Sequence, residues 1–91
     1  MTCYLAEWYR AQPTEELLKG DVEQLDECVN SMCAHGSPVQ LVMTLAIPTD
    51  DLIIGVFTAG SEQVVAQVCR QAGIPLQRLS LAIDARAARQ P

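Results

Sequence analysis

Residues 39–58 have the sequence VQLVMTLAIPTDDLIIGVFT, and this pattern is the strongest indication of the fold class. Two runs rich in β-branched and other apolar residues, Val39 to Ile47 and Leu52 to Thr58, are typical of β-strands. The four residues between the runs, PTDD, are types that favour a turn. The stretch therefore predicts two adjacent antiparallel strands joined as a hairpin.

A helix is predicted on each side of this hairpin. Thr14 can cap a first helix that ends at Gly36, and Ser61 can cap a second that ends at Gly73. Apolar residues at helical spacing form one stripe on the first helix: Leu18, Val22, Leu25, Val29 and Met32. The second helix has an apolar side made of Val65, Val68, Cys69 and Ala72.

Two outer strands complete the pattern, the first from Cys3 to Tyr9 and the last from Leu79 to Ala85. The order strand, helix, strand, strand, helix, strand predicts the ferredoxin-like α+β fold. In this βαββαβ fold a four-stranded antiparallel sheet has both helices on one face. We expect a single domain over residues 1–86 and a frayed tail over residues 87–91.

Composition narrows the class of partner. The formal net charge is −5 and the six Lys and Arg are scattered singly, which argues against binding to nucleic acid. The chain has no basic, uninterrupted apolar leader and no apolar run long enough to span a membrane, so we expect a cytoplasmic protein without a membrane partner. A chain of 91 residues buries a limited core, and a homodimer would extend it.

The segment CVNSMCAHG, residues 28–36, lies at the end of the first predicted helix and contains two cysteines, a methionine and a histidine, which are side chains that can bind soft metal ions. Cys28 and Cys33 lie about 140° apart around a helix axis, so they cannot form a disulfide without unwinding it. Cys28 and His35 are roughly 10.5 Å apart along the axis, too far for one metal ion. We therefore expect free thiols, core packing for Met32 and Cys33, and a helix-ending role for His35.

The sheet offers a better candidate site. Two strands have large apolar residues on the side expected under the helices: Leu41, Met43, Leu45 and Ile47 on one, and Leu79, Leu81 and Ile83 on the other. Their opposite sides hold small and polar residues: Gln40, Val42, Thr44 and Ala46, and Ser80, Ala82 and Asp84. A surface of small residues with a few polar groups is typical of the wall of a small pocket.

The first strand adds to this surface if Trp8 packs under the helices, because Glu7 and Tyr9 then lie on the open side. The predicted ligand-binding residues are Glu7, Tyr9, Thr44, Ser80 and Asp84. Two nearby carboxylates can raise the pKa of one of them and provide a general base, or ligate an ion. Alternatively, these carboxylates pair with Arg10, Arg78 or Arg86 at a dimer rim. The sequence identifies no catalytic residue and no cofactor.

Two segments carry a family resemblance: YLAEWYR, residues 4–10, and DDLIIGVFTAGSEQVVAQVCRQAGIPLQRL, residues 50–79. They resemble a family of small bacterial ferredoxin-like domains of unknown function, of the dimeric α/β barrel type, that includes a nickel-binding protein. The resemblance implies the same fold and a homodimer, and it draws attention to Glu7. This sequence has Gly55 and Cys69 at positions where that family often has a cysteine and a histidine.

Three functions stay open at this point. The first is a homodimeric binding protein that encloses a small apolar or amphipathic ligand; an uncovered sheet face with Leu5, Val42 and Phe57 would favour dimerisation. The second is a soft-metal (nickel-like) binder or thiol sensor that uses Cys69, Cys3 and His35 together with donors from a partner subunit. The third, by analogy of fold, is a small cofactor-independent monooxygenase-like enzyme.

Overall fold

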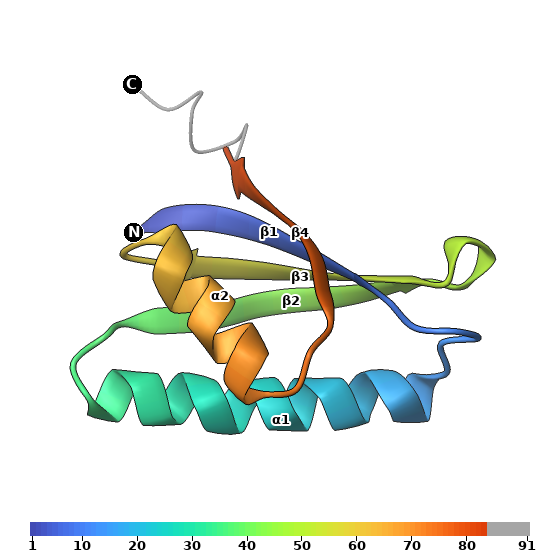
Figure 1. Ribbon diagram of the computed structural model, residues 1–91, viewed down its shortest axis with the longest axis horizontal. Coiled ribbons are helices and arrows are strands. Elements are labelled where there is room, and N and C mark those ends of the chain that lie inside the picture. The colour runs from blue at the N-terminus through green and yellow to red at the C-terminus, as the bar shows by residue number, and fades with distance from the viewer. Residues whose placement is uncertain (84–91) are drawn as a thin grey trace.

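The computed structural model describes residues 1–83, which form a β-α-β-β-α-β arrangement (Figure 1). The elements are β1 (Thr2–Tyr9), α1 (Glu15–Ala34), β2 (Val39–Ile47), the 3-10 turn η1 (Pro48–Asp50), β3 (Leu52–Ala59), α2 (Glu62–Gln71) and β4 (Leu76–Ala82). The four strands form one antiparallel sheet in the order β2-β3-β1-β4, and both helices pack on the same face of it. The predicted ferredoxin-like α+β fold is confirmed.

The helices begin and end where the sequence predicts. Thr14 Oγ1 accepts a hydrogen bond from the backbone N–H of Leu17 at 3.2 Å, and Ser61 Oγ accepts one from Val64 at 3.4 Å. Gly36 and Gly73 follow the two helices with φ angles of 89° and 73°, a left-handed conformation that favours glycine. Within residues 1–83 neither helix is both long and apolar enough to cross a membrane.

The last strand differs from its predicted position. It begins at Leu76, three residues before the predicted Leu79, because Leu76 pairs with Trp8 after a register shift between Glu7 and Trp8. It ends at Ala82. The predicted strand end at residues 84–85 and the predicted frayed tail at residues 87–91 lie outside the described residues.

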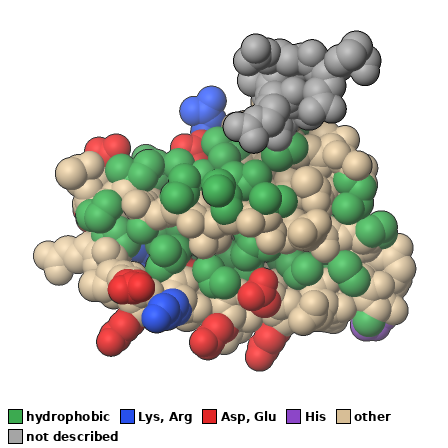
Figure 2. Space-filling view, turned by 180° about the vertical axis from the view of Figure 1, so that it is seen from behind, with side chains coloured by type: hydrophobic (Ala, Val, Ile, Leu, Met, Phe, Trp, Pro, Cys, Tyr) green, Lys and Arg blue, Asp and Glu red, His purple; other side chains and the backbone are tan. Residues whose placement is uncertain are grey.

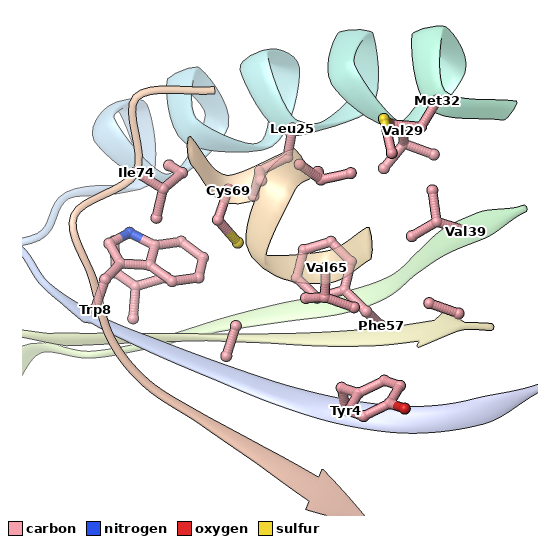
Figure 3. Close-up of a cluster of buried hydrophobic side chains, with 14 residues drawn as sticks. Tyr4, Trp8, Leu25, Val29, Met32, Val39, Phe57, Val65, Cys69 and Ile74 are labelled. Atoms are coloured by element: carbon pink, nitrogen blue, oxygen red, sulfur yellow. The ribbon is translucent and has the colours of Figure 1, made fainter. Parts of the chain in front are cut away.

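The core lies between the sheet and the helices (Figure 3). Trp8, Ile53 and Phe57 project from the sheet and are fully buried against Leu25 of α1 and against α2. Each such side chain contributes about 1.5–3 kcal/mol by leaving water. The expectation that Phe57 lies on the uncovered face is therefore wrong, because the β3 positions that face the helices are Ile53, Gly55, Phe57 and Ala59.

Gly55 fills a tight position in this core. A Cβ atom on Gly55 would lie 3.2 Å from Phe57 Cε1 and 3.2 Å from Trp8 Cζ3, closer than ordinary van der Waals contact. Both aromatic side chains are fully buried and have little room to move. A side chain at this position would enter the core and would not reach the opposite face of the sheet.

A buried carboxylate interrupts the apolar side of α1. Asp21 is only 6% exposed, and its Oδ2 accepts hydrogen bonds from Trp8 Nε1 at 3.1 Å and from Arg10 Nε at 3.0 Å. Arg10 Nη2 donates a third bond to Asp21 Oδ1 at 2.7 Å. The hydrogen bond to Asp21 raises the pKa of Arg10, against the lowering effect of its partial burial. This pairing, which the sequence pattern did not predict, connects the end of β1 to α1.

Candidate functional site on the open sheet face

The open face of the sheet takes its composition from an irregularity in β2. Leu41 pairs with Phe57 and Met43 pairs with Val56. Between these two pairs β2 advances by two residues and β3 by one, so Val42 is the extra residue of a β-bulge. Paired residues of antiparallel strands project from the same face of a sheet. Beyond Val42, residues 43, 45 and 47 therefore project from the open face, and Thr44 and Ala46 project toward the helices.

This result corrects the predicted face assignment. Leu41 lies under the helices as expected, but Met43, Leu45 and Ile47 lie on the open face, while Thr44 lies on the helix side. The expectation failed because strict alternation along a strand holds only where no extra residue is inserted. The open face is therefore far more apolar than the predicted surface of small and polar residues.

The open face is defined here by fifteen residues that the pairing registers place on one side of the sheet. They are Cys3, Leu5, Glu7 and Tyr9 of β1; Gln40, Met43, Leu45 and Ile47 of β2; Leu52, Ile54, Val56 and Thr58 of β3; and Arg78, Ser80 and Ala82 of β4. Figure 2 shows hydrophobic side chains gathered across the side of the molecule away from α2. Tyr9, Met43 and Leu45 expose 50–58% of their surface there.

One ion pair lies within this apolar face. Arg78 Nε is 3.8 Å from Glu7 Oε2, so the two side chains are close but not in hydrogen-bond contact. The Glu7 side chain is 21% exposed and the Arg78 side chain 75% exposed. Of the predicted carboxylate–arginine alternatives, the structure shows Glu7 next to Arg78, whereas Arg10 is engaged by Asp21.

The predicted ligand-binding residues separate into three groups. Glu7, Tyr9 and Ser80 share the open face, with Ser80 opposite Leu5 on the neighbouring strand. Thr44 lies on the other side of the sheet, beside α1. Asp84 lies outside the described residues, so the expected pair of carboxylates, Glu7 with Asp84, stays a prediction.

Side-chain size varies across the open face. One corner has short side chains, because Cys3 lies between Thr58 and Ala82 in the cross-strand row and Ser80 lies in the next row. The opposite end has the larger Leu45, Ile47, Leu52, Ile54 and Tyr9. A molecule that packs on this face therefore meets a small-residue corner, defined as Cys3, Thr58, Ser80 and Ala82, next to the Glu7–Arg78 pair.

The donors of the soft-metal hypothesis do not converge. Cys69 is fully buried in the core, where desolvation, with a smaller effect from Cys28, raises the pKa of its thiol to about 11. Cys3 lies on the open face, and His35 ends α1, with its Nδ1 donating to the carbonyl oxygen of Ser31 at 2.7 Å. No cluster of three potential ligands occurs within residues 1–83. Cys69, Cys3 and His35 do not form a metal site within one chain, and buried Cys69 offers no surface to a partner subunit.

The four cysteines are free thiols, as expected, and Cys28 and Cys33 both lie within α1. Cys33 is exposed rather than packed in the core; its Sγ lies 3.3 Å from the carbonyl oxygen of Val39 and caps the beginning of β2. The expected core role is correct for Met32, which is 8% exposed, and wrong for Cys33.

Comparisons with known proteins support the fold. The crystal structure of SCO4226 from Streptomyces coelicolor A3(2) superposes with a TM-score of 0.79 over 91% of this chain and 99% of that one. The sequence identity is 14%, so the likeness shows a shared fold and nothing further. The chain matches no protein-family model, and no curated protein is significantly similar to it in sequence.

Proposed function

We propose that this protein is a binding protein that works as a homodimer, in which two open faces stack and enclose a small apolar or amphipathic ligand. The observation that carries the proposal is the open face itself: a broad apolar surface interrupted by the Glu7–Arg78 pair. An antiparallel sheet with one face in water normally has polar side chains on that face. Here the middle of that face holds Leu5, Ile54 and Val56 instead.

A second copy of the chain is the partner that fits this face best. Apart from one glutamate and one arginine the open face is uncharged, so it complements itself. When two such faces meet around a twofold axis, every contact occurs twice. Arg78 is mostly exposed and held loosely at 3.8 Å, and it can therefore turn to the partner's Glu7 without breaking a tight bond.

The small-residue corner is the proposed ligand position. Sheets stacked face to face lie about 10 Å apart, and that space is normally filled by interdigitating side chains. Cys3, Thr58, Ser80 and Ala82 are too short to fill it from their side. Their thiol and hydroxyl groups can bond a polar atom of the ligand, while Leu5 and Val56 contact its apolar part.

Native mass spectrometry of untagged protein tests this proposal. We expect a mass of about twice the 9.9 kDa chain, plus an organic adduct that is lost on denaturation. Ala82→Phe, which fills the small-residue corner, should remove the adduct and leave the dimer intact, whereas Ala82→Ser serves as the matched control and should retain it. A dimer without any adduct would refute ligand enclosure, and a retained metal ion would favour the soft-metal alternative, for which Cys3 is the thiol on this face.

A further inference from the structure

β2 forms one edge of the sheet, and among the described residues 1–83 no strand pairs with its outer side. The backbone N–H and C=O groups on that side are available to pair with another chain. Edge strands are commonly protected by charged residues or proline, but β2 contains neither. Its bulge at Val42 disturbs only the first half of the strand, because Met43 to Ile47 pair regularly with β3. These five residues therefore present a regular edge to which a further strand can be added.

A groove lies beside this edge, between β2 and α1. Figure 1 shows α1 running alongside β2. The groove has a volume of about 320 Å³ and is lined by six residues: Leu18, Val22, Thr44 and the charged Glu15, Lys19 and Glu23. Leu18 and Val22 are half-buried, whereas the three charged residues are exposed. A strand added next to Thr44 would project every second side chain into this groove, because alternate residues of a strand point to the same face.

The net charge of the protein is concentrated on α1. The helix contains six Asp and Glu and one Lys, so its formal charge equals the −5 of the whole chain and the other residues sum to zero. Asp21 is buried and paired with Arg10, but the other five acids are exposed. Acidic side chains line the lower edge of Figure 2. Two copies paired through β2 would bring two such helices side by side, so charge disfavours a second copy at this edge and favours a basic partner.

We propose that the outer edge of β2 and the adjoining groove bind an extended basic segment of another protein by strand addition. In this mode of recognition, main-chain hydrogen bonds hold the segment and pockets for alternate side chains select it. A Lys or Arg side chain fits the groove, because its methylene stem can cover Leu18 and Val22 while its charged end reaches the exposed carboxylates. The stacked dimer of the proposed function uses the open face and leaves this edge free, so the two proposals stand independently.

Lys19 determines the pattern of the preferred segment. Glu15, Lys19 and Glu23 are spaced by four residues, so they form one row with the two glutamates about 12 Å apart and Lys19 between them. Along a strand, residues four positions apart are separated by about 13 Å. The segment therefore has two basic residues four positions apart, with an uncharged residue midway, opposite Lys19. Within residues 1–83, neither glutamate has an ion-pair partner within 4.0 Å.

Titration with a synthetic peptide tests this inference. The peptide has seven residues, with valine at the odd positions, arginine at the second and sixth and threonine at the fourth, and both ends are blocked. We expect the backbone NMR signals of Met43 to Ile47 to shift on binding. Alternate amides of this stretch should exchange with solvent about tenfold more slowly when nine-tenths of the protein is bound, since only the free tenth then exchanges. Amides of β2 that exchange no more slowly, or equal slowing along the other edge strand β4, would overturn the inference.

Two control peptides separate strand addition from attraction by charge alone. Proline in place of the central threonine keeps both arginines but removes a main-chain donor, so it should weaken binding by about tenfold or more. A third arginine in place of that threonine raises the charge of the peptide but places it opposite Lys19, so it should not strengthen binding. Unchanged affinity of the proline peptide, or tighter binding of the peptide with three arginines, would contradict the proposed mode.

Charge-reversal variants of the protein test the groove. Glu15→Lys with Glu23→Lys should weaken binding of the peptide by about tenfold, the effect of losing roughly 1.4 kcal/mol. Glu16→Lys with Glu27→Lys, two exposed acids of α1 that do not line the groove, is the matched control with the same change in net charge. It should weaken binding by less than about threefold at physiological salt, because exposed charges more than about 8 Å apart are screened. Equal losses in the two variants would contradict a defined site, and β2 amides already protected in the free protein would mean that a second copy occupies the edge and would overturn the inference.

Discussion

Leu41 and Met43 are two residues apart in β2, yet they lie on opposite faces of the sheet, because Leu41 pairs with Phe57 and Met43 with Val56. The extra residue between them, Val42, is 51% exposed. The bulge brings three large apolar side chains, Met43, Leu45 and Ile47, out of the helix side and onto the open face. A sheet that exposes such a surface is expected to need a partner.

We expect the Glu7–Arg78 pair to contribute to dimerisation through exchange between subunits. Glu7→Arg places two arginines on each open face and should dissociate the dimer, since like charges meet at a shielded interface. Combining Glu7→Arg with Arg78→Glu restores one charge of each sign per face and should recover the dimer. Analytical ultracentrifugation checks both variants. An undiminished dimer in the Glu7→Arg protein would show that this pair lies outside the interface.

Glu7→Gln tests the ligand site with a smaller change, because it removes the charge of Glu7 without reversing it. It should weaken binding of the adduct by about 1–3 kcal/mol, the usual effect of losing a charge-assisted hydrogen bond in a shielded place. In the dissociated chain the change in the free energy of unfolding should be much smaller, because the 3.8 Å pair within one chain, with a mostly exposed Arg78, is weak. Thermal unfolding and titration of the adduct identified by native mass spectrometry measure the two effects. A variant identical to wild type in both would remove Glu7 from the site.

Gly55→Ala should lower the free energy of unfolding by about 1–3 kcal/mol, because the new Cβ atom meets the fully buried rings of Phe57 and Trp8 at 3.2 Å. Gly20→Ala is the matched control. Gly20 lies within α1 with no atom near the position of an added Cβ, so this change should stabilise the protein by about 0.5–1 kcal/mol. Urea unfolding measures both. Equal effects of the two substitutions would mean that the core around Gly55 is loosely packed.

Asp21→Ala should destabilise the protein by about 2–4 kcal/mol, since it removes the acceptor of Trp8 Nε1 and the partner of Arg10. Asp21→Asn retains an acceptor for the indole and should be less damaging. The control is Asp26→Ala on the exposed side of the same helix, expected to change stability by less than about 0.5 kcal/mol. If the two alanine variants unfold at the same urea concentration, Asp21 does not hold β1 to α1.

Ionisation of Cys69 should make the free energy of unfolding depend on pH in the alkaline range. Burial raises the pKa of its thiol from 9.0 to about 11, so above pH 9 the unfolded chain loses this proton while the folded protein keeps it. The free energy of unfolding should therefore fall between pH 9 and pH 11, by about 2–3 kcal/mol from this group. Cys69→Val, which has no ionisable group, should show a flatter profile over this range. Identical pH profiles for the two proteins would contradict the raised pKa.

The fold was predictable from the sequence because its signals are local. Thr14 and Ser61 cap the helices, Gly36 and Gly73 end them, and the turn between β2 and β3 uses ordinary turn residues. The site was predictable only in part, because it depends on the register between strands. Nothing in the run VQLVMTLAI distinguishes a bulge at Val42 from regular alternation, so Thr44 was assigned to the wrong face.

Long-range pairings were missed for a similar reason. Asp21 stands between the apolar residues of α1, and its burial depends on Trp8 and Arg10, thirteen and eleven residues away. A charged residue on a helix is normally taken as exposed. One signal was available: Asp21 lies three residues after Leu18 and four before Leu25, on the buried side of the helix.

Multi-angle light scattering at micromolar concentration, on the untagged protein and on its Ile54→Asp variant, tests whether a second copy covers the open face. Ile54 lies in the middle of the open face and outside the buried core, so this substitution adds a charge to the proposed interface and spares the core. We expect about twice the 9.9 kDa chain mass for the wild type and about one chain mass for a folded Ile54→Asp protein. A wild-type mass of about 9.9 kDa, or an Ile54→Asp protein that stays dimeric, would contradict this expectation.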